Sequence, residues 1–314
     1  MILFLYDHER DYELAPSFLE SASAAHFEPI KSLDWFLWKF IERPSGSILA
    51  CAADQNKIVA CVAFAPQIFK SSVETISSAI SYETFVHPNY QRRGLFSELL
   101  KLAEAECYRR EVDFLINFPN INSIDGFKKN KWQELKQPLY IIYPKYTVKS
   151  FLYSRFIKNE FKICKHTSEN VSSFDNLNQH FGEKLKPLFT KNYIFWRFLS
   201  QNKSYGIVEY DQDFLLYRVG KRGKLIEVQV LMLELKNVSK QSLNKIISQV
   251  KSKLEYHILS FLLSSNHQVA RYMSFPKFIS VPNNTNVCFK SLKNLKPAFL
   301  KENINFESSL YHTY

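Results

Sequence analysis

The stretch that decides the fold is Tyr82-Glu-Thr-Phe-Val-His-Pro-Asn-Tyr-Gln-Arg-Arg-Gly-Leu-Phe96. A strand pattern ends at its His-Pro pair, and an amphipathic helical pattern begins at its glycine, Gly94. Successive backbone N–H groups at such a turn are free, and together with the positive end of the helix they suit an anion such as a pyrophosphate. Gly94 lets the backbone approach the phosphate, and Arg92 and Arg93 add positive charge.

The segments around this turn predict a mixed α/β unit in the first half of the chain. Periodicity and turn residues predict strands near residues 1–6, 48–53, 57–65, 76–87, 112–118 and 132–142, and helices near 7–27, 32–42, 93–110 and 120–130. Asp54-Gln55-Asn56 marks the hairpin between the second and third strands.

The second half repeats this order, which predicts an internal duplication. The matching pairs are Trp38-Lys39-Phe40 with Trp196-Arg197-Phe198, Asp54-Gln55 with Asp211-Gln212, Asn120 with Asn266, and Lys131-Trp132 with Lys277-Phe278. The last two pairs share an offset of 146 residues. We therefore expect an α/β protein with a mixed sheet in each of two related domains, residues 1–145 and 146–314, with a linker near 144–154. At the matching offset the second half reads Asn237-Val-Ser-Lys-Gln-Ser242, without a glycine, so we expect one anion site.

Residues 1–143 resemble the GNAT family of acyl-CoA N-acyltransferases. The family pattern Gln/Arg-x-x-Gly-x-Gly/Ala, placed after a strand ending in Val-x-Pro, corresponds to Val86-His-Pro88 and Gln91-Arg-Arg-Gly-Leu-Phe96. Phe96 stands where the family has a small residue. The second family signature, Asn-x-x-Ala/Ser-x-x-x-Tyr followed by a closing aromatic strand, corresponds to Asn120, Ser123, Phe127 and Trp132.

The resemblance implies acetyl-CoA or another short acyl-CoA as co-substrate and implies no metal. The pantetheine arm would pair with the main chain at Phe85 and Val86, and the pyrophosphate would lie on the loop amides. The cofactor-binding residues implied in this way are Phe85, Val86, Gln91, Arg92, Arg93, Gly94, Leu95, Phe96, Asn120 and Ser123. Two simpler interpretations stay open: the arginines can be a solvated helix start, and Asn120 can be a plain helix N-cap.

The reaction needs a group that removes a proton from the attacking amine. Glu83 lies on the strand expected to reach the thioester, and many family members place their general base there. Strand alternation predicts Glu83 and Phe85 on one face of the sheet and Tyr82 and Thr84 on the other. Glu83 can instead be a surface or ion-paired carboxylate, and His87 is a second candidate base. Phe127 replaces the tyrosine that often protonates the leaving thiolate.

The charge is divided unequally along the chain and bears on the acceptor. Residues 1–150 hold 17 Lys/Arg and 18 Asp/Glu, whereas residues 151–314 hold 24 and 12. The excess positive charge in the second half serves solubility or faces an anion.

Tandem chains of this kind resemble nucleotide-sugar N-acyltransferases for surface polysaccharide, and also aminoacyltransferases that extend peptidoglycan bridges from charged tRNA. The intact CoA loop favours a small acceptor, namely a nucleotide-linked amino sugar, over nucleic acid. A CoA-binding module without turnover is a third possibility.

Composition excludes several other classes of protein. With 314 residues, 46% of them apolar and 15% aromatic, the chain is neither disordered nor fibrous. Its five cysteines form no CxxC pair and no zinc-binding pattern, so we expect buried, reduced thiols. The first residues do not read as a signal peptide, and no apolar run reaches about 18 residues. We therefore expect a cytoplasmic protein without a membrane span. The sequence does not indicate its oligomeric state.

Overall fold

The computed structural model describes residues 1–145, 182–199, 205–293 and 295–311. Within these residues the chain forms two compact units. Unit 1 comprises residues 1–69, 75–135 and 285–301, and unit 2 comprises residues 70–74, 136–284 and 302–314. The expected linker near 144–154, and Cys164, lie almost wholly outside the described residues.

Unit 1 is built on a mixed sheet with the strand order β1-β2-β3-β4-β5-β14-β6. Its strands are β1 (Ile2–Leu5), β2 (Ile48–Asp54), β3 (Lys57–Lys70), β4 (Thr75–Val86), β5 (Phe114–Asn117), β6 (Gln133–Glu134) and β14 (Cys288–Ser291). Its helical segments are α1 (His8–Asp11), η1 (Tyr12–Leu14), α2 (Ala15–His26), α3 (Leu33–Phe36), η2 (Leu37–Ile41), η3 (Pro88–Tyr90), α4 (Leu95–Arg109) and α5 (Ile124–Lys129).

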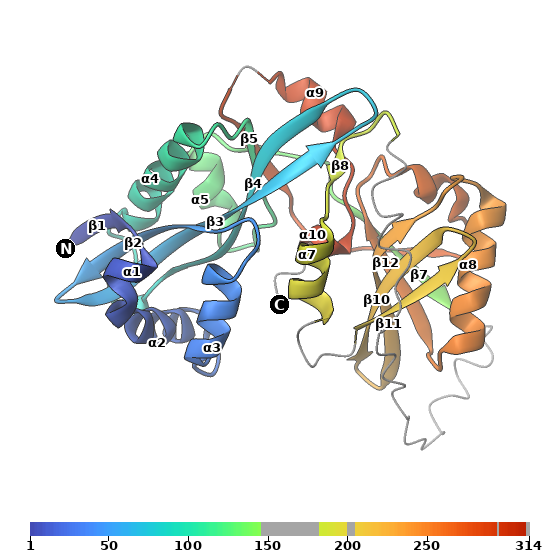
Figure 1. Cartoon of the computed structure of the whole chain (residues 1–314), viewed down its shortest axis with the longest axis horizontal. Helices are drawn as coiled ribbons and strands as arrows, with labels where there is room; N and C mark the ends of the chain where they lie inside the picture. Colours follow the sequence, from blue (N-terminus) through green and yellow to red (C-terminus); the bar gives the residue numbers. More distant parts are fainter. Residues whose placement is uncertain (146–181, 200–204, 294, 312–314) are drawn as a thin grey trace. The chain divides into compact units, whose positions relative to one another are not determined.

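Helices cover both faces of this sheet, because its central strands are apolar on both sides (Figure 1). Along β2, alternate residues face opposite ways. Ile48 and Ala50 pack in the cluster that contains the apolar side of α4, whereas Leu49 and Cys51 pack in the cluster of α2 and α3. Burying each large apolar side chain contributes about 1.5–3 kcal/mol, so these two layers hold the strands in register.

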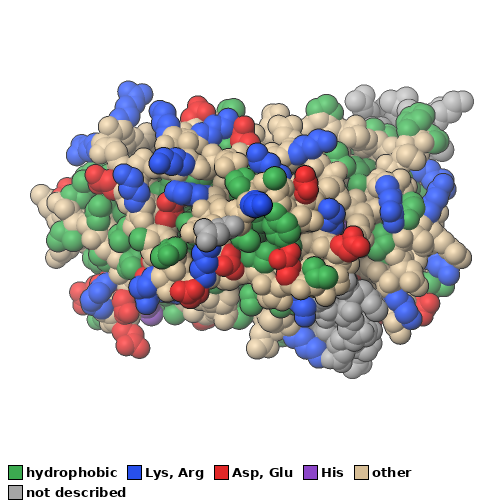
Figure 2. All heavy atoms as spheres, turned by 90° about the horizontal axis from the view of Figure 1, so that it is seen from above, with side chains coloured by type: hydrophobic (Ala, Val, Ile, Leu, Met, Phe, Trp, Pro, Cys, Tyr) green, Lys and Arg blue, Asp and Glu red, His purple; other side chains and the backbone are tan. Residues whose placement is uncertain are grey.

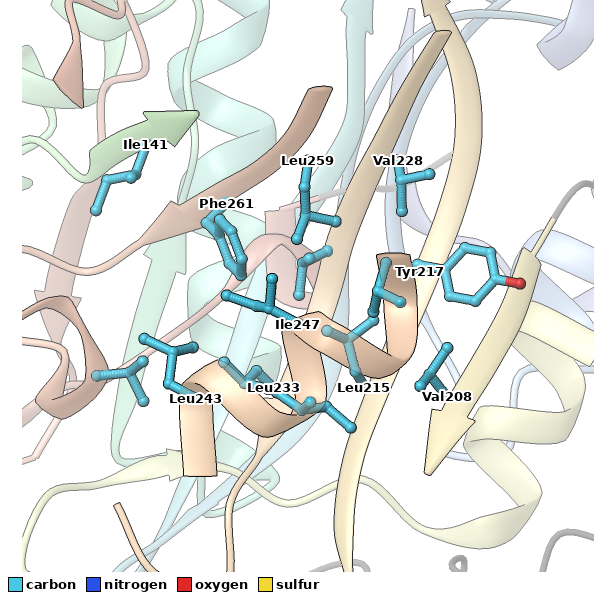
Figure 3. Close-up of a cluster of buried hydrophobic side chains, with 14 of the residues drawn as sticks. Ile141, Val208, Leu215, Tyr217, Val228, Leu233, Leu243, Ile247, Leu259 and Phe261 are labelled. Atoms are coloured by element: carbon cyan, nitrogen blue, oxygen red, sulfur yellow. The ribbon is translucent and has the colours of Figure 1, made fainter. Parts of the chain in front are cut away.

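Unit 2 is built on a second mixed sheet, with the strand order β13-β7-β12-β11-β10-β9. Its strands are β7 (Leu139–Pro144), β9 (Tyr205–Tyr210), β10 (Asp213–Arg222), β11 (Leu225–Glu234), β12 (Ile258–Leu263) and β13 (Ile279–Val281). Its other elements include β8 (Lys186–Pro187), α7 (Lys191–Ile194), the π-helix η6 (Phe195–Leu199), α8 (Lys240–Lys253), η7 (Gln268–Tyr272) and α10 (Ser308–Tyr311), while α9 (Pro297–Asn303) runs from unit 1 into unit 2. Figure 3 shows Leu243 and Ile247 of α8 among side chains of β10 and β12 in the core of this unit.

The two units exchange strands. β14, from the C-terminal part of the chain, pairs antiparallel with β5 and β6 of unit 1. β7, which follows β6 in sequence, pairs antiparallel with β12 of unit 2 along its whole length, from Leu139 to Pro144. Each sheet is therefore completed by a segment that is distant in sequence from most of its strands.

The expectation of a mixed α/β protein with two sheets is confirmed, and most element boundaries agree within about two residues. The units are not two consecutive stretches divided at residue 145, because residues 136–145 belong to unit 2 and residues 285–301 to unit 1. Hydrophobic periodicity locates a strand but carries no information about which of two similar sheets it joins.

The strand exchange predicts how fragments behave. A fragment of residues 1–145 lacks β14, whose Cys288 and Phe289 are fully buried, so we expect it to show no cooperative thermal unfolding. Leu135 N donates to Val287 O at 2.8 Å, beside the antiparallel pair Glu134–Cys288. A chain that joins Leu135 to Val287 through Asn-Gly and ends at residue 301 forms a hairpin there and should unfold cooperatively. Calorimetry of the two fragments checks this, and cooperative unfolding of residues 1–145 would contradict it.

Candidate functional site

The site begins where two parallel strands of unit 1 part. β4 and β5 pair only at Ser78–Phe114, Ala79–Leu115 and Ile80–Ile116. β4 continues for six further residues to Val86, whereas β5 ends at Asn117. Local hydrogen bonds are formed at these ends, from Gln91 Nε2 to Val86 O at 3.3 Å and from Phe118 N to the Asn117 side chain at 2.7 Å. The stretch of β4 that includes Phe85 and Val86 therefore extends beyond its pairing with β5.

A bulge in β4 places Glu83. Its backbone is in the left-handed region at φ 45°, which is rare for a residue with a side chain. The expected alternation is therefore wrong, because Tyr82 and Phe85 both pack in the cluster of α2 and α3. The extra residue shifts the register of the faces by one, so Glu83 does not share a face with Phe85 as a regular strand would require.

The Glu83 carboxylate meets the ammonium group of Lys39. Lys39 Nζ lies 2.9 Å from Glu83 Oε1, and the two side chains are 2% and 16% exposed. Lys39 is carried by the π-helix η2, and its ammonium lies 5.4, 6.0 and 5.8 Å from the ring centres of Trp35, Trp38 and Tyr82. Glu83 is thus the ion-paired carboxylate that we kept as an alternative, but on a partly buried strand bulge.

Tyr82 beside this pair is a neutral phenol. Burial raises the pKa of Tyr82 far above its ordinary value, so the hydroxyl keeps its proton at neutral pH. The hydroxyl forms a 2.6 Å hydrogen bond with Ser47, and the Arg43 guanidinium lies over the ring at 5.4 Å. Cys61 is fully buried nearby, and burial likewise raises the pKa of its thiol. Glu83 is therefore the carboxylate in this part of the site, beside a phenol and a thiol that both keep their protons.

The loop after β4 leaves backbone amides open. Arg92 and Gly94 both have positive φ, 62° and 82°, and Gly94 is the N-cap of α4 with no side-chain cap. Ser97 N and Glu98 N both donate to Gly94 O, at 3.0 and 3.2 Å. Within the described chain the amides from Arg92 to Phe96 are not used as donors, as the first turn of an uncapped helix predicts. This is the geometry that binds a phosphate at a helix N-terminus.

The two arginines of the loop differ in their contacts. Arg93 donates to Asn89 O at 2.8 Å and stacks on Tyr90, whose hydroxyl donates to Asp54 at 2.9 Å. Arg92 is exposed and forms no hydrogen bond or ion pair with described residues. Arg93 therefore fixes the loop, and Arg92 is the cation left for an anion.

Phe96 and Phe127 explain the departures from the family pattern. Phe96 packs on Gly126 of α5, where an added Cβ would come within 3.0 Å of its ring. Phe127 is 1% exposed and packs edge-on against both Phe96 and Trp132. The absence of a side chain at Gly126 accommodates the large residue at the helix start, and Phe127 is a core residue.

Asn120 and Ser123 form a local turn. The Asn120 side-chain oxygen accepts from the backbone N–H groups of Asn122 and Ser123, both at 3.0 Å, and from the Ser123 hydroxyl at 3.1 Å. Asn120 therefore closes a turn just ahead of α5 and is not the helix N-cap, because the N-cap of α5 is Ser123. Both residues are at the surface or half-buried, beyond the end of β5.

In unit 2 the space beyond the paired ends of β11 and β12 is occupied by the segment that contains Glu307. The parallel ladder of β11 and β12 ends at Val230–Phe261. Beyond it, Glu307 bridges the two strands, since its backbone pairs with Leu263 and its side chain accepts from Leu233 N at 2.7 Å. The same carboxylate binds His267 Nε2 at 2.9 Å.

The helix that follows in unit 2 is also closed. Ser239 caps α8 by accepting from Ser242 N at 3.1 Å. Lys186 pairs with Glu234 at the end of β11, while burial raises the pKa of the Glu234 carboxyl. In unit 1, therefore, β4 and β5 separate and the helix that follows β4 has no side-chain cap. In unit 2 the helix that follows β11 is capped by Ser239, and Glu307 lies between the ends of β11 and β12.

Sequence reasoning did not find Lys39 or Glu307 as parts of these sites. Lys39 had a signal, because a lysine between Trp35, Phe36, Trp38 and Phe40 on one helical segment must be buried with them. Glu307 gave none, because its role depends on the return of the C-terminal segment to unit 2.

Metal and membrane signals are absent from the described residues. No three His, Cys, Asp or Glu side chains there are grouped so that they could hold a metal ion. Cys51, Cys61, Cys107 and Cys288 are free and buried. None of the helices described is both long and apolar enough to cross a bilayer.

Comparison with known proteins agrees with this geometry. Residues 5–129 match the acetyltransferase (GNAT) family. No curated protein matches the chain. This match agrees with the expectation of an acyl-CoA-dependent N-acyltransferase.

Solved structures show the same fold over almost the whole chain. A GCN5-related N-acetyltransferase from Anabaena variabilis ATCC 29413 is 9% identical with a TM-score of 0.66, covering 93% of this chain and 73% of that one. Eis1 from Mycobacterium abscessus is 9% identical with a TM-score of 0.62, covering 93% and 74%. A GCN5-related N-acetyltransferase from Kribbella flavida is 12% identical with a TM-score of 0.63, covering 93% and 71%.

The open loop of unit 1 generates a prediction for Gly94→Glu. The new carboxylate would repel a pyrophosphate, so we expect calorimetry to show no CoA binding, against one CoA per chain for the wild type. Gly223→Glu is the matched control, because both glycines have positive φ, 82° and 60°, with no atom within 4 Å of an added Cβ. Each variant pays about 1–2 kcal/mol of backbone strain. Unchanged affinity in Gly94→Glu, or two CoA per wild-type chain, would contradict the assignment.

Proposed function

We propose that the protein transfers an acetyl or short hydroxyacyl group from CoA to the amino group of a nucleotide-linked amino sugar destined for surface polysaccharide. The observation that carries the transfer is the combination, within unit 1, of an uncapped helix after a parted strand and a carboxylate on the bulge of that strand. Unit 2 has neither feature in its described residues.

In this proposal the pantetheine arm lies along β4 at Phe85 and Val86, and the pyrophosphate lies on the amides from Arg92 to Phe96. Gln91 holds the end of the strand through its bond to Val86 O. Arg92 supplies the free positive charge. Asn120 keeps its side-chain nitrogen for the arm, because its oxygen is used within the turn with Ser123.

The chemistry follows from the groups available. Glu83 removes a proton from the acceptor amine, directly or through a water molecule, and the neutral amine attacks the thioester carbonyl. The carbon–sulfur bond then breaks with its electron pair on sulfur, and the second proton that the nitrogen loses as the amide forms passes through solvent to the CoA thiolate. A donor at Phe127 is not part of this sequence, because that position is a buried phenylalanine. A CoA thiolate is stable enough to leave without such help.

The nucleotide-linked acceptor is supported by the basic second half. Of the cations near its first hairpin, Arg197 is 5% exposed and Arg222 pairs with Glu227. Arg218 and Lys221 remain for a diphosphate. Figure 2 shows one face, on which Lys and Arg side chains are interspersed with acidic ones. Trp38 and Trp196 are both 7% exposed and are core residues, so neither offers a stacking face.

Two further statements belong to the proposal. The matching segments α3–η2 and α7–η6, each with a serine or threonine N-cap, a short α-helix and a π-helix, support an internal duplication. An acyl-CoA co-substrate and four buried free thiols support a cytoplasmic location.

Release of CoA thiol over a panel of amines tests the function. We expect nucleotide-linked amino sugars to be turned over with a much higher kcat/KM than the same free sugars, mainly through KM. Raising salt should weaken the linked substrates more, because salt screens phosphate contacts. Equal kcat/KM for linked and free forms would contradict the nucleotide-linked acceptor. Absence of thiol release with every amine, with CoA binding intact, would indicate a binding module, and salt-sensitive retention of tRNA would favour the aminoacyltransferase alternative.

The role of Glu83 is tested by Glu83→Gln. We expect kcat to fall at least ~100-fold at neutral pH, and the loss to shrink at high pH, where the amine loses its proton unaided. Glu20→Gln, at an exposed position of α2, is the matched control and should leave kcat unchanged. A near-normal kcat for Glu83→Gln at neutral pH would exclude the general-base role.

A further inference from the structure

Two irregular backbone segments of unit 1 meet in one ion pair. Lys39 lies on a π-helix, a conformation that occurs mostly as short insertions and often at functional sites. Glu83 has a positive φ of 45° on a strand, a conformation that persists only where the surroundings hold it. The 2.9 Å contact between their charged groups joins the helix to the strand at the place where both depart from regular geometry.

Burial makes this contact hard to replace. The Lys39 side chain is 2% exposed among Trp35, Trp38 and Tyr82, where an ammonium without a counter-charge is strongly unfavourable. The aromatic rings offer partial compensation, and the Glu83 carboxylate supplies the opposite charge. The attraction therefore fixes one carboxylate oxygen, Oε1, on the buried side.

The other carboxylate oxygen remains available. Glu83 Oε2 has no hydrogen-bond or ion-pair partner among the described residues, and the Glu83 side chain is 16% exposed. Lys39 thus holds Oε1 of the Glu83 carboxylate, and Oε2 is the oxygen that can accept a proton.

Unit 2 contains a counterpart of Lys39 but no counterpart of Glu83. Arg197 occupies the same place in η6, is 5% exposed, and donates to the Tyr193 hydroxyl. The bulge in β11 falls at Leu231, between the pairs Leu216–Met232 and Tyr217–Val230, and carries no carboxylate. A buried cation on the π-helix is common to both units, whereas the carboxylate on the bulge occurs in the unit with the uncapped helix.

We propose that Lys39 is the positioning residue for Glu83, holding its carboxylate on the β4 bulge so that Oε2 faces the acceptor amine. This inference rests on the proposed function of Glu83 as general base. One proton of the acceptor ammonium passes to Oε2, and the nitrogen then bonds to the acyl carbon. The carbon–sulfur bond breaks with its electron pair remaining on sulfur, and the second proton lost by the nitrogen passes through solvent to that thiolate. Lys39 stays protonated throughout and neither gives nor takes a proton.

A double-mutant cycle on kcat tests the inference in the full-length protein. The variants are Lys39→Met, Lys39→Arg, Glu83→Gln and the double variant Lys39→Met/Glu83→Gln, assayed by thiol release with the best amine of the panel. We expect Lys39→Met to lower kcat at least ~10-fold with the KM for acetyl-CoA within about twofold, which is part of the ~10²–10⁴-fold typical of a general base. Lys39→Arg should stay within about threefold of wild type, since Arg197 shows that this position on the π-helix takes an arginine.

The decisive comparison is between the double variant and Glu83→Gln. If Lys39 acts through Glu83, removing it costs kcat nothing further once the carboxylate is gone, and the two values agree within about twofold. A merely structural lysine would lower kcat by the same factor in both backgrounds, which would overturn the inference. If Lys39→Met does not fold, Lys39→Gln keeps a polar group there and is compared in the same way.

The remaining outcomes separate this inference from the proposed function. Normal kcat in Lys39→Met beside a large loss in Glu83→Gln overturns the positioning role and leaves the transferase and its base in place. Normal kcat in Glu83→Gln overturns both the base and its positioning residue, while the transferase stands. Absence of turnover by the wild type with every amine overturns the proposed function and this inference together.

Discussion

The site depends on the early separation of two parallel strands. β4 and β5 share three residue pairs and then part, because β4 runs on to Val86 while β5 ends at Asn117. Parallel strands bury their main-chain groups in regular ladders, so a strand that leaves its ladder inside a domain needs another partner. In unit 2 the chain supplies that partner through Glu307. In unit 1 the proposed partner is the extended, amide-bearing arm of CoA.

The contrast between the two helices that follow these strands is as informative as the motif itself. Gly94 leaves the first amides of α4 without a side-chain cap, whereas Ser239 caps α8. A serine cap stabilises a helix by about 1 kcal/mol, and the uncapped terminus forgoes this stabilisation. An uncapped terminus with two left-handed residues is therefore a cost that an anionic ligand can offset.

The exchange of β7 and β14 links the stability of the two units. Each sheet needs a strand from the other part of the sequence to cover apolar positions, and Cys288 and Phe289 of β14 are fully buried in unit 1. Unit 1 consequently depends on β14, which is distant in sequence from its other strands. Lys290 of β14 reaches Glu104 of α4 at 2.6 Å, where Trp132 also donates to that carboxylate at 2.8 Å. The helix that presents the open amides is held from both parts of the chain.

The sequence alone determined the element order, the mixed α/β class and the loop from Gln91 to Phe96, because periodicity, turn residues and a left-handed glycine are local properties. It also showed that unit 2 lacks the glycine of this loop. The tertiary structure decided the rest. The bulge at Glu83 reversed the expected faces of β4, and the buried Lys39 that meets it comes from a helix more than 40 residues away in sequence. Which sheet β7 and β14 join, and the closure of unit 2 by Glu307, follow from packing between distant segments. No local pattern encodes these features, because their free energy comes from apolar burial and charge pairing that exist only once the chain has folded.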